Sequence, residues 1–225
     1  MQIQEQLQKR ELKRRQIEGK LADFWASAKL RRDARNLAVF LSLLTAAVLG
    51  RVALQHVPSV EPIIPLAVLA GMLFGMKEGF TLGGSAYIIS NFFVWGLQGP
   101  WTVFQALGAA LAGTLGGAFG KLKAPSAKDL VIVSIAGTVI FEIIMNISGA
   151  AMGLGLAVGL IGLPLYFLTS LPFSAAHIAT NAAFARLFAP LLKLRRPDDE
   201  LKAISITRTS GGIATNVRMY RAKPE

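Results

Sequence analysis

Apolar residues run through the middle of this chain in long stretches, separated by short polar, glycine-containing or proline-containing segments. A helix needs roughly 20 mostly apolar residues to cross the hydrocarbon core of a bilayer. The pattern therefore predicts an all-α membrane protein built as a bundle of six transmembrane helices. The predicted helices cover residues 37–55, 63–75, 79–97, 101–120, 130–152 and 164–192.

The rest of the chain divides around this 37–192 bundle. Residues 1–36 alternate basic and apolar positions at loosely helical spacing, which predicts a basic amphipathic helix in the cytoplasm. That helix either rests on the anionic leaflet or serves as a docking arm for a partner. Residues 193–225 form a polar cytoplasmic tail. The glycine-rich stretch 153–162 is either a re-entrant or surface segment, or a continuation of a neighbouring helix.

The Lys and Arg residues set the predicted orientation. Residues 1–36 hold ten of the 24 and residues 193–225 hold eight. Of the remaining six, four fall in two alternate connections: Lys77, Lys121, Lys123 and Lys128. The other connections, 55–62, 96–100 and 153–163, contain no Lys or Arg. Positive charge gathers on the cytoplasmic side of membrane proteins, so both termini are predicted inside.

Composition agrees with this interpretation. Charged residues make up 16% of the chain, against about 25% in a typical soluble domain. Basic flanks around an apolar centre explain the net charge of +11 without a nucleic-acid partner. The chain contains no cysteine, and its charged start does not resemble a cleavable signal peptide. We therefore predict a multi-pass protein of the plasma membrane.

Polar and aromatic side chains collect in the outer half of the predicted bundle. Ionisable groups at membrane depth are costly and usually face a cavity or a partner. Segment 91–105 mixes amides with two tryptophans around a Gly-Pro turn, which suits either an interfacial aromatic belt or the wall of a ligand pocket. The convergence of polar groups favours a pocket. The candidate substrate-binding residues are Arg51, His56, Asn91, Trp95, Gln98, Trp101, Gln105, Glu142, Asn146 and His177.

Small residues recur every fourth position on two predicted helices. They let helix backbones approach closely in lipid. Gly108, Ala112 and Gly116 favour packing inside the bundle, whereas Ser42, Ala46 and Gly50 offer a face for an external partner.

The sequence contains few residues that could form a catalytic or metal-binding site. Ser85 and His177 are the only components for a membrane serine hydrolase, and nothing in their spacing connects them. His56 and His177 lie on different segments, so no metal site or cofactor is predicted. A Walker-type phosphate loop is absent. The protein is predicted not to be an enzyme, and any ATP hydrolysis would come from a partner.

The run from Pro58 to Lys121 resembles the substrate-binding components of energy-coupling factor (ECF) transporters, the vitamin-uptake family of ABC importers. The features that match are Pro58, Pro62 and Pro65, then Leu69-Ala70-Gly71, Gly75, Glu78-Gly79 and Gly83, Asn91-Phe92-Phe93, Gly99-Pro100-Trp101-Thr102 with Gln105, and Gly113 with Gly117. The segment from Asn91 to Gln105 is the most specific part. The resemblance covers about a third of the chain by motif.

This resemblance implies a six-helix bundle that captures a vitamin or related micronutrient from outside. Such a subunit docks on a membrane coupling subunit that is joined to two cytoplasmic ATPases. The family's docking face corresponds here to Ser42, Ala46 and Gly50. The sparse charge of the predicted pocket leans towards a mostly neutral, ring-containing ligand. A self-sufficient secondary transporter or channel, using Glu142 with His177, and a membrane scaffold are the alternatives.

Overall fold

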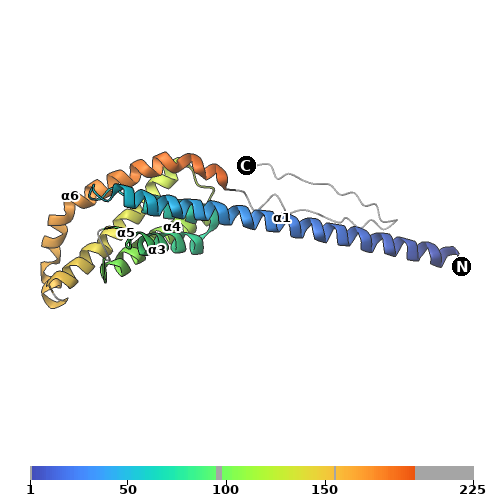
Figure 1. The fold of residues 1–225 in the computed structure, drawn as a ribbon, viewed down its shortest axis with the longest axis horizontal. Coiled ribbons are helices and arrows are strands. Elements are labelled where there is room, and N and C mark those ends of the chain that lie inside the picture. The colour runs from blue at the N-terminus through green and yellow to red at the C-terminus, as the bar shows by residue number, and fades with distance from the viewer. Residues whose placement is uncertain (1, 95–97, 155, 196–225) are drawn as a thin grey trace.

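The computed structural model describes residues 2–94, 98–154 and 156–195, and this part of the chain is all-helical. The helices are α1 Gln2–Leu54, α2 Ile63–Phe74, α3 Met76–Ser90, α4 Trp101–Leu122, α5 Ala127–Leu154, α6 Leu156–Phe188 and the 3-10 helix η1 Ala189–Leu194 (Figure 1). Four segments are long and apolar enough to cross a membrane: Arg15–Leu54, Trp101–Leu122, Ala127–Gly153 and Ile161–Leu194. The predicted all-α class is confirmed for these residues.

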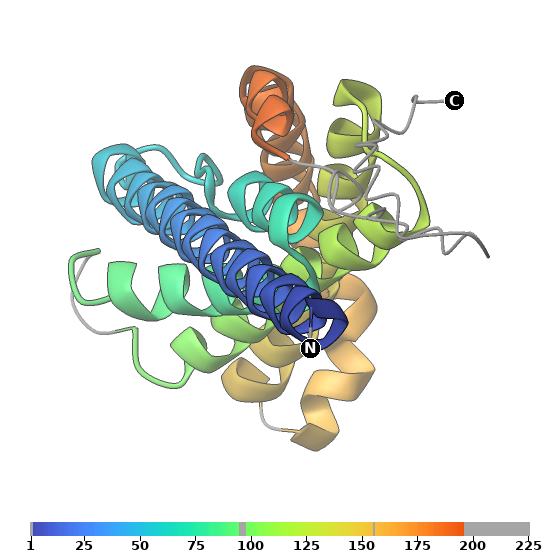
Figure 2. The ribbon, with the colours of Figure 1, turned by 90° about the vertical axis from the view of Figure 1, so that its right-hand side faces the viewer.

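One continuous helix, α1, replaces two predicted elements. The basic segment 1–36 and the first span, 37–55, join without a break because no proline interrupts the chain before Pro58. With 53 residues, α1 is about 80 Å long. Its N-terminal half extends away from the other helices as an isolated arm (Figures 1 and 2).

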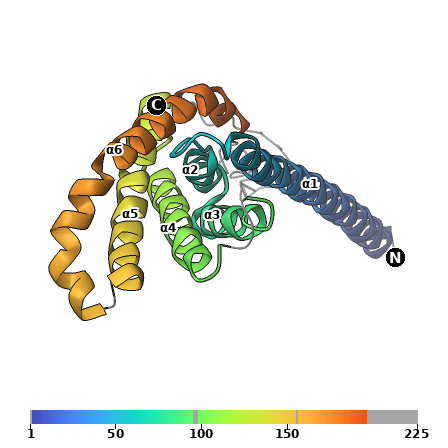
Figure 3. The ribbon, with the colours of Figure 1, turned by 60° about the vertical axis from the view of Figure 1, so that its left-hand side comes forward.

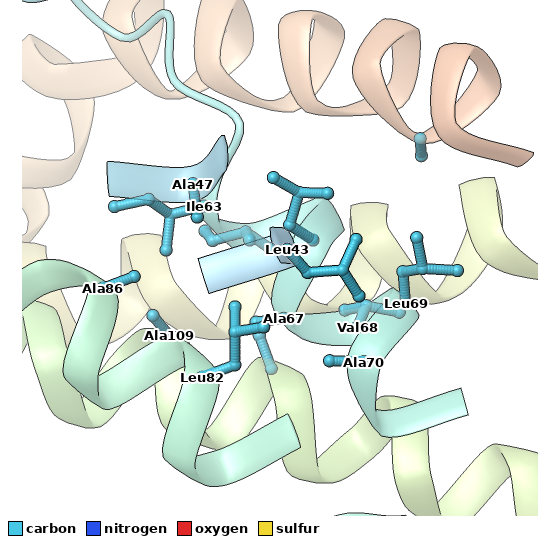
Figure 4. Packing of buried hydrophobic residues seen from close by; sticks show 14 of the residues in the cluster. Leu43, Ala47, Ile63, Ala67, Val68, Leu69, Ala70, Leu82, Ala86 and Ala109 are labelled. Carbon is cyan, nitrogen blue, oxygen red and sulfur yellow. The ribbon is translucent and has the colours of Figure 1, made fainter. Parts of the chain in front are cut away.

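The shortest α-helix, α2, lies at the centre of the bundle. It contacts α1, α3, α4, α5 and α6, and every residue from Ile63 to Met72 is buried (Figures 3 and 4). Its 12 residues and the 15 of α3 fall short of the length predicted for a span. Other helices surround α2, and in a bilayer such cover would keep a short helix away from hydrocarbon.

A glycine makes the reversal between α2 and α3. Gly75 has φ +126° and ψ 177°, a conformation that side chains with a Cβ rarely adopt. The turn brings Gly71 of α2 and Gly79 of α3 against the same residue of α4, Gly113. As a result α3 begins at Met76 rather than at Gly79, and it ends at Ser90 rather than continuing to residue 97 as predicted.

The small residues of α4 pack against backbone, as predicted. A Cβ added at Gly113 would lie 2.1 Å from the carbonyl oxygen of Gly79, and one at Gly116 would lie 2.3 Å from that of Val68. Gly108 similarly faces the ring of Phe141 on α5. Close approach of this kind provides the van der Waals contact that holds helices together where lipid removes the hydrophobic driving force.

Helices α5 and α6 form a long hairpin at one side of the bundle. Within the described residues, the backbone of α6 packs closely against α5, α2 and η1 but not against α1, α3 or α4. Pro164 and Pro172 interrupt the hydrogen-bond ladder of α6, which bends in Figure 3. The glycine-rich stretch 153–162 continues the two helices, and its residue 155 lies outside the described residues, as does the predicted tail from residue 196 onward.

Basic residues mark one end of the bundle, which we call the basic end. Lys123 pairs with Asp129 at 2.9 Å, and Arg195 donates to the carbonyl oxygen of Gly120 at 2.7 Å. Arg35 of α1 reaches a carbonyl oxygen of η1 at 3.3 Å. Residues 55–62 and 98–100, from connections predicted to lack Lys and Arg, adjoin the opposite ends of α1 and α4.

Two neighbouring glycines on α3 give a matched test of the packing. Gly83→Ala would place its Cβ 2.3 Å from the carbonyl oxygen of Ala109, while Gly84→Ala finds its nearest neighbours at 3.8 Å. We expect Gly83→Ala to lower the free energy of unfolding by about 1–3 kcal/mol through overpacking. Thermal unfolding of the detergent-solubilised protein measures the effect. Equal melting temperatures for the two variants would contradict the close α3–α4 contact.

Candidate functional site

The last turn of α1 places a guanidinium inside the bundle. Arg51 is 8% exposed, and its Nε donates to Oε2 of Glu61 at 2.8 Å. Its Nη1 donates to the Ser90 hydroxyl at 2.8 Å and to Oδ1 of Asn91 at 2.5 Å. One cation thus joins the end of α1, the connection before α2 and the end of α3.

Glu61 is the buried carboxylate at the centre of these contacts. Its Oε2 accepts from Arg51, and its Oε1 accepts from the hydroxyl of Tyr87, which is fully buried on α3. The Arg51 guanidinium also lies 4.7 Å from the centroid of the Tyr87 ring. On the side facing α6, Nε2 of His177 lies 3.4 Å from Oε1 of Glu61.

Asn91 extends the contacts to α4. While its Oδ1 accepts from Arg51, its Nδ2 donates to Oγ1 of Thr102 and to Oε1 of Gln105, both at 2.8 Å. The amide is therefore used on both sides, so its orientation is fixed and the start of α4 is tied to the end of α3.

A second carboxylate, Glu142, lies midway along α5. Its Oε1 is 2.6 Å from Nδ1 of His177, and its Oε2 accepts from the hydroxyl of Ser174. Ser174 and His177 lie three residues apart on α6, which places them on one face of that helix. Phe141 completes the enclosure by stacking on Tyr87, with ring centroids 5.3 Å apart, and meeting His177 edge-on at 5.4 Å.

These side chains form one connected set, which we call the polar network. Its members are Arg51, Glu61, Tyr87, Ser90, Asn91, Thr102, Gln105, Glu142, Ser174 and His177. They come from α1, α3, α4, α5, α6 and the connection between α1 and α2. Charges removed from water are tolerated only when oppositely charged and hydrogen-bonded groups replace the solvent. The network meets this condition with two carboxylates facing one guanidinium and one imidazole.

The network is closed in this structure. Its polar groups bond to one another, except that Nε2 of His177 is buried without a hydrogen-bond partner. Two shallow surface depressions lie elsewhere, beside Lys77 and Phe80 and between Lys128 and Arg186. In the part of the chain that the structure describes, no three His, Asp or Glu side chains are arranged to hold a metal ion.

Comparison with known proteins gives one match. Residues 31–200 match a family model described as a family of unknown function, DUF6580. The chain belongs to this family. No curated protein and no solved structure gives a significant match. The DUF6580 region contains the whole polar network and all the helices except the N-terminal part of α1.

Half of the predicted binding residues meet in the network of this DUF6580 chain. They are Arg51, Asn91, Gln105, Glu142 and His177. The sequence indicated them because ionisable and amide groups within apolar helices need partners.

The other predicted residues lie beside the network or away from it. Asn146 is buried but donates to the backbone carbonyl of Glu142, one turn away. Trp101 packs against Gly149 of α5, and Gln98 donates to the carbonyl oxygen of Val94 at 3.4 Å. The remaining two are His56, which is exposed, and Trp95, which lies outside the described residues.

Sequence reasoning missed five network members: Glu61, Tyr87, Ser90, Thr102 and Ser174. A signal existed for Glu61, because it is the only acid in connections otherwise free of charge. Tyr87 precedes Asn91 by one helical turn, so the two share a face of α3. The hydroxyl residues gave no such signal, since Ser and Thr in apolar helices usually bond to their own backbone.

The predicted docking residues on α1 do not share one environment. Ser42 and Ala46 are exposed, whereas a Cβ on Gly50 would lie 2.5 Å from the ring of Pro62. Gly50 therefore packs against the connection that carries Glu61.

Removing the guanidinium tests whether the network supports the fold of this DUF6580 protein. We expect Arg51→Met to lower the free energy of unfolding by about 3–5 kcal/mol, because the two buried carboxylates of the network then lack one balancing positive charge. The double variant with Glu61→Met should recover most of this loss, since both charges are then absent. Chemical unfolding in detergent measures both.

The exposed Arg186 on α6 supplies the control. Arg186→Met should change the same free energy by no more than about 0.5 kcal/mol. If the double variant were as unstable as Arg51→Met, the pairing of Arg51 with Glu61 would not be what stabilises this end of the bundle.

Proposed function

We propose that this protein is the substrate-capture subunit of an ATP-driven importer of the ECF type in the plasma membrane. It binds a vitamin-like small molecule at its outer face and delivers it by docking on a membrane coupling subunit with two ATPase subunits. The observation that carries the proposal is the polar network, which gathers amide, aromatic and charged side chains from five helices at one end of a membrane bundle.

The position of the network relative to the positive charges supports an outward-facing site. Glu61, Asn91 and Thr102 belong to connections or helix ends that lack Lys and Arg, while Lys123 and Arg195 lie at the basic end. Under the positive-inside rule the basic end faces the cytoplasm, and the network faces outward.

The directions of the helices support six crossings with both termini inside. Helices α1 and α3 end at the network, and α4 begins there, because Arg51, Asn91 and Thr102 are in contact. The antiparallel pair α5–α6 then returns the chain to the basic end, where Arg195 meets the end of α4. The short helix α2 fits such a topology because its neighbours surround it, whereas α3 buries one face and exposes the apolar side chains of Phe80, Ile88 and Ile89 on the other.

Aromatic side chains next to the network supply a surface for a ring-containing ligand. Trp101 and Tyr166 both lie against Gly149, at 3.0 and 2.9 Å from the position a Cβ would occupy there. Aromatic faces provide apolar area, and neighbouring amides such as Gln105 fix orientation.

Docking and energy supply come from partners. The exposed small residues Ser42 and Ala46 lie on α1 between exposed leucines, Leu41 and Leu49, which suits contact with another membrane helix.

The decisive experiment identifies what the full-length protein carries. Purification from its native membrane, followed by mass spectrometry, should reveal a bound small molecule together with a coupling subunit and ATPases. If the protein carried neither, or if it catalysed flux alone in proteoliposomes without an ATPase, the proposal would be wrong.

A tryptophan pair tests the location of the site. Trp101→Ala should raise the Kd for the identified molecule at least about tenfold, because truncating an aromatic anchor costs about 2 kcal/mol. Trp25→Ala, on the projecting arm of α1, is the matched control and should leave the Kd unchanged. Calorimetric titration of both variants measures the Kd, and equal values would place the ligand elsewhere.

A further inference from the structure

The imidazole of His177 lies between two carboxylates. Its Nδ1 is 2.6 Å from Oε1 of Glu142 on α5, and its Nε2 is 3.4 Å from Oε1 of Glu61. A neutral imidazole carries a hydrogen on one ring nitrogen and a lone pair on the other. The contact at Nδ1 is a hydrogen bond, whereas Nε2 is buried close to Glu61 without forming one. Whichever tautomer formed, the lone pair would lie near a carboxylate oxygen. With both carboxylates ionised, both contacts are attractive only when both ring nitrogens carry hydrogen.

Charge balance leads to the same protonation state. The charged or titratable groups packed around His177 are Arg51 from α1, Glu61 before α2, Tyr87 from α3 and Glu142 from α5. Helix α4 contributes only uncharged groups to the network. With a doubly protonated His177, two positive charges balance two negative ones. With a neutral ring, one negative charge would remain unbalanced inside the bundle.

Close packing around His177 leaves little room for a bound cation that could balance the second carboxylate. His177 is 4% exposed, Phe141 covers one edge of its ring, and Ser174 occupies the free oxygen of Glu142. A proton needs no cavity. We propose that His177 is the binding site of an exchangeable proton, and that this proton holds the network end of the bundle closed. The inference is independent of the proposed function, because a proton site can exist whether or not the protein captures a ligand.

Few polar contacts in the described part of the chain attach α6 to the connection that carries Glu61. The backbone of α6 does not pack closely against that of α1 or α3 in the described residues. Glu61 is a polar link between them, because it binds Arg51 and Tyr87 on one side and faces His177 on the other. One further strap joins α6 to the same connection, the hydrogen bond from Thr180 Oγ1 to the carbonyl oxygen of Ser59 at 2.9 Å.

Loss of the proton turns attraction into repulsion at this link. The lone pair of a neutral His177 then faces one of the two carboxylates, and the unbalanced charge draws water towards the network. The helix is able to respond, because Pro172 removes a backbone hydrogen bond five residues before His177. We expect α6 to move away from the connection that carries Glu61.

Histidine content makes the proton directly observable. The chain has two histidines, so His56→Gln leaves His177 as the only source of imidazole signals. Nitrogen-15 NMR of the histidine-labelled variant in nanodiscs should show a doubly protonated ring at a pH where free histidine in the same buffer is neutral. Adding Glu142→Gln removes one negative charge, and the doubly protonated signal should be lost at that pH. A neutral ring in the His56→Gln protein would overturn the proposal.

The absence of cysteine makes the motion measurable. Val57→Cys and Phe173→Cys place spin labels at two exposed positions, one on the connection and one on α6. The distance between the labels should lengthen as pH rises through the transition seen by NMR. In a His177→Gln background, it should stay long and independent of pH. If the distance stayed constant while His177 lost its proton, the proton would not control closure and the proposal would fail.

Discussion

A carboxylate buried between helices must keep a cation and hydrogen-bond donors around it, and in this protein that requirement falls on Glu61. The residue belongs to no helix, yet it contacts Arg51 of α1 and Tyr87 of α3, and it faces His177 of α6. Each of these partners is itself fixed by further bonds, Arg51 through Asn91 and His177 through Glu142. Satisfying one buried charge therefore sets the relative positions of most of the bundle at this end.

Packing and polar contacts divide the work of holding the bundle together. The glycines of α4, such as Gly113 and Gly116, bring α2, α3 and α4 to backbone contact along their length. That contact is close but carries little chemical specificity, because one small residue resembles another. The polar network adds the specificity: a shift of one residue along α3 would separate Asn91 from Arg51 and from Gln105. The glycine contacts and the polar network therefore both fix the register of α3 against α4.

The sequence predicts features that depend on the composition of a whole helix, or on the free-energy cost of burying a single polar group. Span-length apolar runs gave α4 almost to the residue, and polar groups at membrane depth gave Arg51, Glu142 and His177. It did not predict features that depend on two segments meeting. Glu61 falls in a predicted connection between two spans, and only the folded chain shows that Pro62 packs against Gly50 and brings this connection into the bundle. The sequence also predicts a boundary between the basic segment and the first span, because the polarity changes there, whereas the helix backbone continues without a break.

The polar network lies inside the region that matches the family, whereas most of the projecting arm of α1 lies before it. Residues 31–200 include every partner of Glu61 and every close glycine contact, so the network and the packing belong to the DUF6580 unit. The projecting part of α1 lies before it and exposes Ile17, Leu21 and Phe24 to solvent. Because this arm rises from the same helix that carries Arg51, any partner that fixes the arm also restrains the helix that anchors Glu61. A rigid helix transmits such a restraint along its axis, so the arm and the network are physically connected although they lie at opposite ends of α1.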